Sequence, residues 1–482
     1  MKRSVSLLVV LCLSFFMLYA QDGKTHYYEL DGGNIQYEMI LYNTLLFGIG
    51  SKSMMTNSTL KNYGVESIYW NPAGLGFLKK GEIFIDYAPP VFISPTRFID
   101  LQDNVDEAVD DEFKDKMIGG APYIYPDLNA EFSSGTRFQS FGFALPVKQF
   151  TFGAAYYNQF ELKLNMFSSG VGIHMKDYED IGVSDTTSMR LSLNFGANLN
   201  FYSEAISFAF AYQPLEQLAI GLTVENYNVS AVANGNINKN GWMYRSSYDK
   251  VYYFNDPSQG YYNSLLDTLK GSFHGNSMAI RLGSSYRFNQ QSELAFTLYI
   301  PFTVKMTGNL YISNTTPVFY SGGEIDEDKI LENLDQRTKT KQVKYYSRGM
   351  DIRIPGNVKL GYTYAFSGVS FIFNAGYSFN EFSYHYANYE VDKTKSKRIL
   401  REYHQGIKPG ADLRLGIDFG TIKLGTGVIF CKHIKDYKEE GSIPIPLFSI
   451  AFGFPVGEHL KINGHLLSLT LPLSRVSLTY SF

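Results

Sequence analysis

The side chains that most often do chemistry in proteins are few and scattered in this sequence. It contains no Gly-x-Ser-x-Gly nucleophile elbow and no His-Glu-x-x-His zinc motif. Its eight histidines show no metal-ligand spacing, and its two cysteines, Cys12 and Cys431, lie far apart in the chain. We therefore expect no catalytic residues, no metal site and no cofactor, and we expect that the protein is not an enzyme.

Charged side chains are balanced rather than concentrated. The sequence has 43 Lys and Arg against 46 Asp and Glu, whereas nucleic-acid-binding proteins usually carry a basic excess. We therefore expect no nucleic-acid partner. The basic cluster between Lys393 and Arg401 is interpreted as a solvated loop, with contact to anionic lipopolysaccharide as the alternative. The acidic stretch Asp103–Asp115 lacks the glycine of a calcium-binding EF-hand loop and predicts a short amphipathic helix.

A rigid turn is predicted at Asn71, Pro72, Ala73, Gly74 and Leu75. Proline fixes its own φ and pushes the preceding asparagine towards extended geometry, and the asparagine side chain can cap the turn. The glycine of the turn and the glycine that follows Leu75 let the backbone pass close to a neighbouring wall. Asn-Pro also starts many ordinary turns, so the position of this motif matters more than its letters.

The last eight residues, Arg475–Phe482, alternate strictly between polar and apolar side chains. Val476, Leu478, Tyr480 and Phe482 share one face of the predicted strand. This pattern resembles the terminal strand of bacterial outer-membrane proteins, in which a final Phe is read by the barrel-assembly machinery. The resemblance implies that Tyr480 and Phe482 form an assembly signal, and the alternative is an ordinary last strand of a periplasmic sandwich.

The elements that must position these motifs have a period of two residues. In the stretch 277–288, apolar side chains alternate with polar and charged ones that include Arg281 and Arg287. A strand with one face in lipid and one face in a wet lumen requires this alternation. We expect the two arginines to face the lumen and the apolar side chains to face outward, namely Met278, Ile280, Leu282 and Phe288.

The composition also favours a transmembrane β-barrel. Aromatic residues make up 16% of the chain and charged residues only 18%, against about 25% charged residues in soluble globular proteins. The mean hydropathy of -0.15 is too polar for a bundle of membrane helices. The uncharged stretch 362–380 is predicted to form two strands around a turn at Ser367 and Gly368, rather than a membrane helix.

Fifteen stretches qualify as strands, whereas single-chain bacterial barrels have even numbers of strands. We therefore predict an all-β fold, a transmembrane antiparallel β-barrel of about 14 strands, in which either 81–88 or 187–200 is not a separate strand. Short turns are expected at one rim. Long polar loops are expected at the other rim, at roughly 92–136, 166–187, 234–271, 312–349 and 389–406.

Residues 1–20 have the pattern of a cleaved secretory signal peptide. Lys2 and Arg3 precede an apolar run, Val5–Tyr19, and Ala20 supplies a small residue at the cleavage site. The run is shorter than the roughly 20 residues that a membrane-spanning helix needs. Removal of the signal would leave Cys431 as the single cysteine, which excludes an intramolecular disulfide.

The turn at Asn71–Leu75 lies between this signal and the first predicted strand. In that position it resembles the hallmark of the FadL-like outer-membrane transport proteins, whose N-terminal hatch carries an Asn-Pro-Ala-Gly-Leu-type turn just before strand one. The resemblance is specific over Ser67–Leu75 and general over the rest of the chain. It implies a hatch at residues 21–80 that plugs the lumen and shapes a ligand pocket, and a barrel at residues 81–482.

The same resemblance implies a function. A FadL-like protein transports hydrophobic small molecules passively, such as long-chain fatty-acid-like ligands, across the outer membrane of a Gram-negative-type cell. The alternative is a PorV-like outer-membrane component of a type IX protein secretion and surface-attachment system. An outer-membrane phospholipase is a third hypothesis, for which the sequence offers no serine–histidine constellation. The expected partners are outer-membrane lipid and lipopolysaccharide, the barrel-assembly machinery and a hydrophobic small-molecule ligand.

Overall fold

The structure is a computed structural model of the 482-residue chain. It describes residues 26–30, 32–43, 64–89, 92–93, 102–103, 106–107, 110, 124–133, 137–178, 186–245, 250–254, 265–317, 338–346, 350–392, 397–435, 437–468 and 473–482. The predicted signal peptide, residues 1–20, lies outside the described residues, as does most of the acidic stretch. Within the described part of the chain, no helix is long and apolar enough to cross a membrane.

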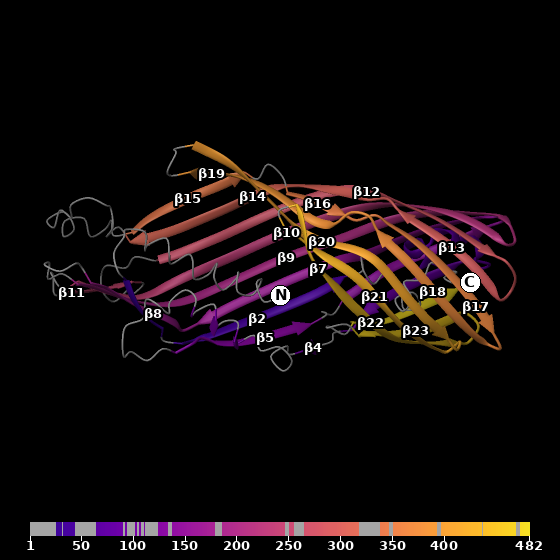
Figure 1. Cartoon of the computed structure of the whole chain (residues 1–482), viewed down its shortest axis with the longest axis horizontal. Coiled ribbons are helices and arrows are strands. Elements are labelled where there is room, and N and C mark those ends of the chain that lie inside the picture. The colour runs from indigo at the N-terminus through magenta and orange to yellow at the C-terminus, as the bar shows by residue number, and fades with distance from the viewer. Residues whose placement is uncertain are drawn as a thin grey trace.

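Fourteen strands form a closed antiparallel ring at the end of the molecule that carries the short turns (Figure 1). Strand β24 pairs with β3 from Val476↔Tyr87 to Ser481↔Glu82, so the two ends of the sheet meet and the ring has no open edge. This confirms the prediction of an all-β barrel of about 14 strands. In order around the ring, the strands are β3 (Glu82–Ala88), β6 (Arg137–Val147), β7 (Phe150–Ser169), β9 (Thr186–Leu215), β10 (Leu218–Arg245), β12 (Leu265–Arg287), β13 (Ser292–Tyr299), β17 (Asn357–Phe366), β18 (Val369–Ser378), β20 (Lys397–Asp418), β21 (Ile422–Lys435), β22 (Lys438–Val456), β23 (Leu460–Ser468) and β24 (Leu473–Ser481).

Strand β9 explains why fifteen candidate strands become fourteen. The two candidates 187–200 and 203–213 are one continuous strand of 30 residues. It pairs with β10 along nearly its whole length and with β7 along half of it, so no turn interrupts it near residue 201. The stretch 81–88, which was the other candidate for removal, is the first strand of the ring, β3.

The barrel wall has an apolar outer face, and its inner face carries polar and charged side chains among small and aromatic ones. On β12, Met278 is 66% exposed on the outside, whereas Arg281 is 6% exposed and faces the lumen. The guanidinium of Arg287 also lies inside, over the ring of Phe77. The predicted orientation of this strand is confirmed, and its exposed apolar side chains are Met278, Ile280, Leu282, Tyr286 and Phe288. The predicted hairpin at 362–380 is confirmed as well, with Ser367 and Gly368 at positive φ between β17 and β18.

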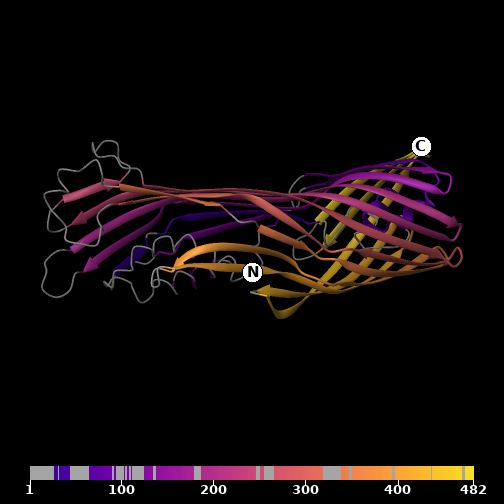
Figure 2. The same cartoon turned by 90° about the horizontal axis from the view of Figure 1, so that it is seen from above.

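Several strands continue far beyond the length that a membrane requires. A membrane-crossing strand needs about 9–11 residues, but β9 has 30 residues, β10 has 28 and β12 has 23. Figures 1 and 2 show these strands running away from the barrel as a long curved sheet. We call this sheet the extension; it comprises residues 160–169 of β7, 186–203 of β9, 228–245 of β10, 265–276 of β12 and the strands paired with them.

The prediction of long loops at the far rim is therefore wrong for most of the described residues in these stretches. Most of the described residues in these five stretches are extended, because the strands continue and shorter strands join them. The composition of Asn234–Lys239 predicts a loop because asparagine and glycine are depleted in strands, yet this segment pairs in register with both β9 and β12. The strands outside the ring are β1 (His26–Leu30), β2 (Asn34–Asn43), β4 (Phe92–Ile93), β5 (Asp127–Ser133), β8 (Val171–Tyr178), β11 (Lys250–Phe254), β14 (Phe302–Pro317), β15 (Thr338–Tyr346), β16 (Met350–Ile354) and β19 (Phe382–Asp392).

The N-terminal segment is divided between two places. Residues 34–43 form β2, which pairs with β7 and with β5 in the extension rather than lying in the barrel lumen. The reason is visible in the register of β7. Its pairing with β6 ends at Tyr157, and β2 takes over from Phe160 onward, which supplies partners for backbone groups that β6 does not reach. Of the segment predicted as a hatch, only residues 64–78 are described inside the barrel.

The two faces of the sheet exchange polarity along the strands. In the barrel, β9 presents Phe208 outward and Ser207 inward; in the extension, it presents Asn198 outward and Leu199 inward. The inward residues of the extension align across β2, β7, β9 and β10 as an apolar row, Met39–Leu164–Leu199–Ala233. The outward row beside it is polar, Glu38–Asn165–Asn198–Asn234. The extension is therefore an amphipathic sheet whose apolar face continues the lumen wall.

Candidate functional site

Residues 64–78, which we call the plug, fill the barrel lumen and are buried throughout. They form a four-residue helix, α3 (Ser67–Trp70), and a 3-10 helix, η1 (Pro72–Phe77). The hydroxyl of Ser67 donates to the carbonyl of Gly64 at 2.6 Å, and the amide of Val65 donates to Glu82 at 3.3 Å, which fixes the start of the plug to strand β3.

Asn71 joins the two short helices and ties them to the wall. Its backbone is extended, at φ -151° and ψ 101°, and its side-chain oxygen accepts a hydrogen bond from the amide of Ala73 at 3.1 Å. Its side-chain amide donates to the carbonyl of Ser284 on β12 at 3.2 Å. Pro72 begins η1, where its missing N–H costs nothing, and the amide of Gly74 donates to the carbonyl of Asn71. Leu75 is buried at the centre of the plug.

The wall makes room for the plug with its own glycines. A Cβ at Gly283 would overlap the side-chain oxygen of Asn71, and one at Gly221 would overlap the backbone of Pro72. A Cβ at Gly142 would lie 2.6 Å from Val65, and one at Gly153 would lie 2.9 Å from Ile68. Close backbone approach was expected only of glycines in the plug itself, whereas these four wall glycines lie on four different strands and no local motif marks them.

Successive inward side chains of β10 each meet a different part of the plug. Ala219 packs with Phe77, and the hydroxyl of Thr223 donates to the carbonyl of Ile68 at 2.9 Å. Glu225 lies beside Tyr69, and Tyr227 follows it on the side of the extension. A single strand thus positions the plug from the short-turn rim towards the extension, because every second side chain faces the lumen.

Glu225 is the centre of a buried polar cluster above the plug. Its carboxylate lies 3.3 Å from the guanidinium of Arg281 on β12, and its side chain is 0% exposed. Tyrosine hydroxyls from three strands donate to it, Tyr157 at 2.6 Å, Tyr227 at 2.9 Å and Tyr299 at 3.1 Å. Removing one partner of a buried ion pair commonly costs about 3–5 kcal/mol, because the other charge is left without compensation. The three tyrosine hydroxyls therefore supply the hydrogen bonds that this carboxylate cannot obtain from solvent.

Three cations from the wall lie over three aromatic rings of the plug. The guanidinium of Arg281 is 4.4 Å from the ring centre of Tyr69, and that of Arg287 is 3.5 Å from the ring centre of Phe77. The ammonium of Lys359 on β17 is 5.3 Å from the ring centre of Trp70. Each such contact contributes about 0.5–1 kcal/mol at exposed sites and about 2 kcal/mol when desolvated.

The lumen wall on the extension side of the plug is aromatic. The ring of Tyr227 lies 4.7 Å from that of Phe302, and the ring of Phe160 lies 5.3 Å from that of Phe201 and 6.0 Å from that of Phe382. We call these five residues, together with Tyr299, the aromatic belt. Aliphatic side chains pack with the belt in the same apolar cluster, and these include Val304, Met306, Ile352 and Ile354.

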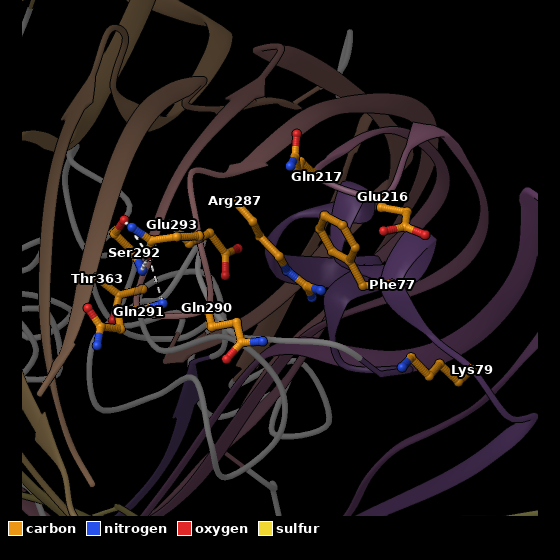
Figure 3. Close-up of a pocket in the computed structure, with 11 residues that line it drawn as sticks. Phe77, Lys79, Glu216, Gln217, Arg287, Gln290, Gln291, Ser292, Glu293 and Thr363 are labelled. Atoms are coloured by element: carbon orange, nitrogen blue, oxygen red, sulfur yellow. Dashed lines mark hydrogen bonds between the residues drawn. The ribbon is translucent and has the colours of Figure 1, made fainter. Parts of the chain in front are cut away.

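An open, polar pocket of about 660 Å³ lies on the other side of the plug, at the short-turn rim (Figure 3). We call it the mouth pocket. Phe77 of the plug and Arg287 of β12 both line it, and Figure 3 shows the long side chain of Arg287 reaching towards the ring of Phe77. The carboxylate of Glu293 accepts a hydrogen bond from Ser285 at 2.5 Å. The remaining lining residues are Lys79, Glu216, Gln217, Asn289, Gln290, Gln291, Ser292 and Thr363.

The C-terminal residues close the barrel by pairing with β3, the strand that follows the plug in the chain. Tyr480 and Phe482 are exposed on the outer face, at 46% and 55%, together with Val476 and Leu478. The amide of Phe482 donates to the carbonyl of Gly81 at 2.9 Å, immediately before β3. The terminal aromatic side chain therefore lies at the junction between the last strand and the first.

No group of three or more His, Cys, Asp or Glu side chains among the described residues could hold a metal ion. His385 and His404 face each other across β19 and β20, with ring centres 6.4 Å apart, and the ring of Tyr437 stacks on His404 at 4.2 Å. This arrangement is a packed aromatic contact at the outer part of the barrel wall.

No protein-family model matches the sequence, and no curated protein matches it. Solved structures are similar to it, among them the toluene transporter TodX of Pseudomonas putida, at 14% identity and a TM-score of 0.48 over 91% of this chain and 99% of that one. The CymD monoaromatic hydrocarbon channel is 12% identical, with a TM-score of 0.48 over 91% and 98% of the two chains. A FadL homologue of Pseudomonas aeruginosa is 11% identical, with a TM-score of 0.45 over 92% and 98%.

Proposed function

We infer that this protein is a FadL-like channel that carries hydrophobic small molecules passively across the bacterial outer membrane. The observation that carries the proposal is the continuous apolar inner face, which runs from Met39, Leu164 and Leu199 in the extension to the aromatic belt and stops at the plug. Long-chain fatty-acid-like molecules are the ligand class that the resemblance of the Asn71–Leu75 turn implies.

Elementary energetics supports such a route. Apolar surface gains about 25 cal/mol for each Å² removed from water, so a hydrophobic molecule concentrates on an apolar sheet face and in an aromatic lumen. The plug closes the lumen to polar solutes. The mouth pocket beyond it is open and lined mostly by polar and charged residues, so we expect an apolar molecule to gain less there than in the aromatic belt and to be released towards the periplasm.

The remaining elements of the proposal concern export and assembly. The signal peptide 1–20 is cleaved after Ala20, and the barrel-assembly machinery recognises the terminal strand with Tyr480 and Phe482. The apolar outer face of the barrel then contacts outer-membrane lipid, and the polar outer face of the extension stands among lipopolysaccharide headgroups. Residues 64–80 act as the functional hatch, and the protein performs no catalysis.

Uptake by a deletion strain tests the proposal. Cells lacking the gene are compared with the parent and with a complemented strain for uptake of radiolabelled oleate and of a labelled sugar of similar mass. We expect oleate uptake to fall and to recover on complementation, with sugar uptake unchanged. If oleate uptake is unchanged while surface-attached proteins disappear from the cell envelope, the PorV-like alternative is correct instead.

A further inference from the structure

The plug and the wall meet through one type of contact that recurs at both ends of the plug. Tyr69 and Trp70, on the extension side, and Phe77, at the rim, each carry a wall cation over their ring. Two of these cations, Arg281 and Arg287, stand six residues apart on β12, so both face the lumen from the same strand. Cation–π contacts between the aromatic rings of the plug and the cations of the wall therefore hold the plug at both ends.

Arg281 contacts both the plug and the wall. Its guanidinium lies 4.4 Å from the ring centre of Tyr69 on the plug and 4.5 Å from that of Tyr299 on the wall. Glu225 holds the same guanidinium by an ion pair, and Tyr299 donates a hydrogen bond to Glu225. The ring of Tyr69 also packs edge-on against Tyr157, which donates to Glu225 as well.

We propose that Arg281, positioned by Glu225, is the residue that keeps the plug seated in the barrel, and that it does so through the ring of Tyr69. The proposal deepens the function above, because it rests on the lumen being a route that the plug closes. Glu225 and Arg281 are positioning residues, since they act on the plug and not on a transported molecule. The latch consists of Glu225, Arg281 and Tyr69.

The chemistry of the latch makes distinct demands on its three members. Arg281 contacts Tyr69 both over the aromatic face and through a side-chain hydrogen bond with the phenol hydroxyl, so phenylalanine at position 69 keeps only the first of these contacts. The latch needs a cation at position 281, so lysine can replace arginine in part, although it cannot reproduce the planar guanidinium between two rings. It needs a carboxylate at position 225, because only a charge fixes the guanidinium in the buried cluster.

Accessibility of a reporter thiol measures how firmly the plug is seated. Ser67 is fully buried, two residues before Tyr69, and cysteine is nearly isosteric with serine. Ser67→Cys is placed in a Cys431→Ala background, and a water-soluble maleimide is added to the purified barrel in lipid vesicles. No transported ligand is present, so the rate of labelling reports on the plug alone.

The expected result is a graded series. Labelling of the reporter becomes at least ten-fold faster with Arg281→Gln and with Tyr69→Leu, and it is intermediate with Tyr69→Phe and with Arg281→Lys, each of which keeps part of the contact. Arg414→Gln is the matched control. Arg414 is an equally buried wall arginine, held by Asp412 at 2.7 Å, and its replacement leaves the rate unchanged.

Folding is monitored in parallel by the heat-dependent gel mobility that intact barrels show. If Arg281→Gln does not fold, the double variant Glu225→Gln with Arg281→Gln removes both buried charges and replaces it in the series. Labelling rates within two-fold of the parent for both Tyr69→Leu and the folded Arg281 variant overturn the proposal. Oleate uptake by the parent together with unchanged labelling in the variants would contradict the latch and leave the proposed function standing. Faster labelling in the variants together with no oleate uptake by the parent would support the latch and contradict the proposed function.

Discussion

At the scale of single residues, the plug is held both by side chains that contact it and by wall glycines that leave room for it. Gly283 and Gly221 lie where any side chain would occupy the space of Asn71 and Pro72. The asparagine then uses both ends of its amide, one towards Ala73 in the plug and one towards Ser284 in the wall. The turn and its seat are therefore one unit, although Asn71 and Ser284 lie 213 positions apart in the sequence.

Gly283→Ala tests this seat. The new methyl group overlaps the Asn71 side chain, so we expect a loss of about 1–3 kcal/mol, the usual cost of overpacking. Gly235→Ala is the control, because a Cβ there makes only ordinary contacts, 3.7 Å from Ala197. The temperature at which each folded barrel loses its gel-mobility difference measures the effect. Equal transition temperatures for the two variants contradict the described seat.

Charges outside the membrane-spanning part give a second residue-level prediction. Glu439, at the outer end of the β21–β22 hairpin, accepts hydrogen bonds from Lys408 and Lys432, each at 2.6 Å, which lowers the pKa of its carboxyl from 4.5 to about 2. A lowered folded-state pKa stabilises the hairpin at pH values above the unfolded pKa, and this stabilisation is lost as the pH falls from about 4.5 through about 2.

Hydrogen exchange of the hairpin amides measures this effect. We expect exchange at residues 432–440 to accelerate relative to the barrel as the pH falls from 5 to 2.5, after correction for intrinsic rates. Glu439→Gln should make relative protection independent of pH across this window. A parent protein whose hairpin protection stays constant across the window would show that the triad does not stabilise the hairpin. The effect is small because these side chains are exposed and their interaction is screened by water.

At the scale of elements, alternation determines what the sequence reveals. The outward side chains of β12 and the terminal strand could be assigned from their period, since lipid and lumen impose opposite polarity on successive residues. The length of β9 and β10 could not, because their outer parts keep the period of two but reverse its sense and contain asparagine and glycine. The position of β2 could not either, since only the register of β7 creates the need for it.

The terminal element yields a prediction about assembly. Deletion of Phe482 should lower the amount of protein in the outer membrane and raise degraded or periplasmic material, because the resemblance of this strand makes its last aromatic residue the recognition signal. Phe482→Trp keeps an aromatic ring and should restore the level. Cell fractionation with quantitative immunoblotting measures both. Unchanged outer-membrane levels after the deletion would mean that the residue only completes the β24–β3 pairing.

At the scale of the whole molecule, the site is an ordered series of environments along one axis. The apolar face of the extension leads to the aromatic belt, then to the Glu225 cluster and the plug, and then to the polar mouth pocket. The barrel, the turn motif and the terminal strand could be predicted from the sequence because each is a local pattern. The Glu225 cluster could not, because its tyrosines and Arg281 come from four strands and only barrel closure brings them together.

Neighbouring residues on β9 test whether the whole axis carries ligand. Leu199 faces the apolar side of the extension and Asn198 faces the polar side, so Leu199→Asp interrupts the apolar face while Asn198→Asp adds the same carboxylate to the outer face. We expect oleate uptake by complemented cells to fall at least five-fold with Leu199→Asp and to remain within two-fold of the parent with Asn198→Asp. Equal uptake by the two variants, at equal surface levels, contradicts a role for the extension.

The length of the extension has a consequence for the cell envelope. A strand of 30 residues such as β9 spans roughly 100 Å at about 3.3 Å per residue, of which a bilayer crossing uses only about a third. The outer surface of a Gram-negative cell is a hydrated carbohydrate layer in which greasy molecules dissolve poorly. In the orientation that we propose, the extension rises tens of ångströms through this layer, with its polar face towards the sugars and its apolar face available as a surface along which hydrophobic molecules diffuse. The surface that captures a hydrophobic molecule is then the whole length of the extension rather than the opening of the barrel alone.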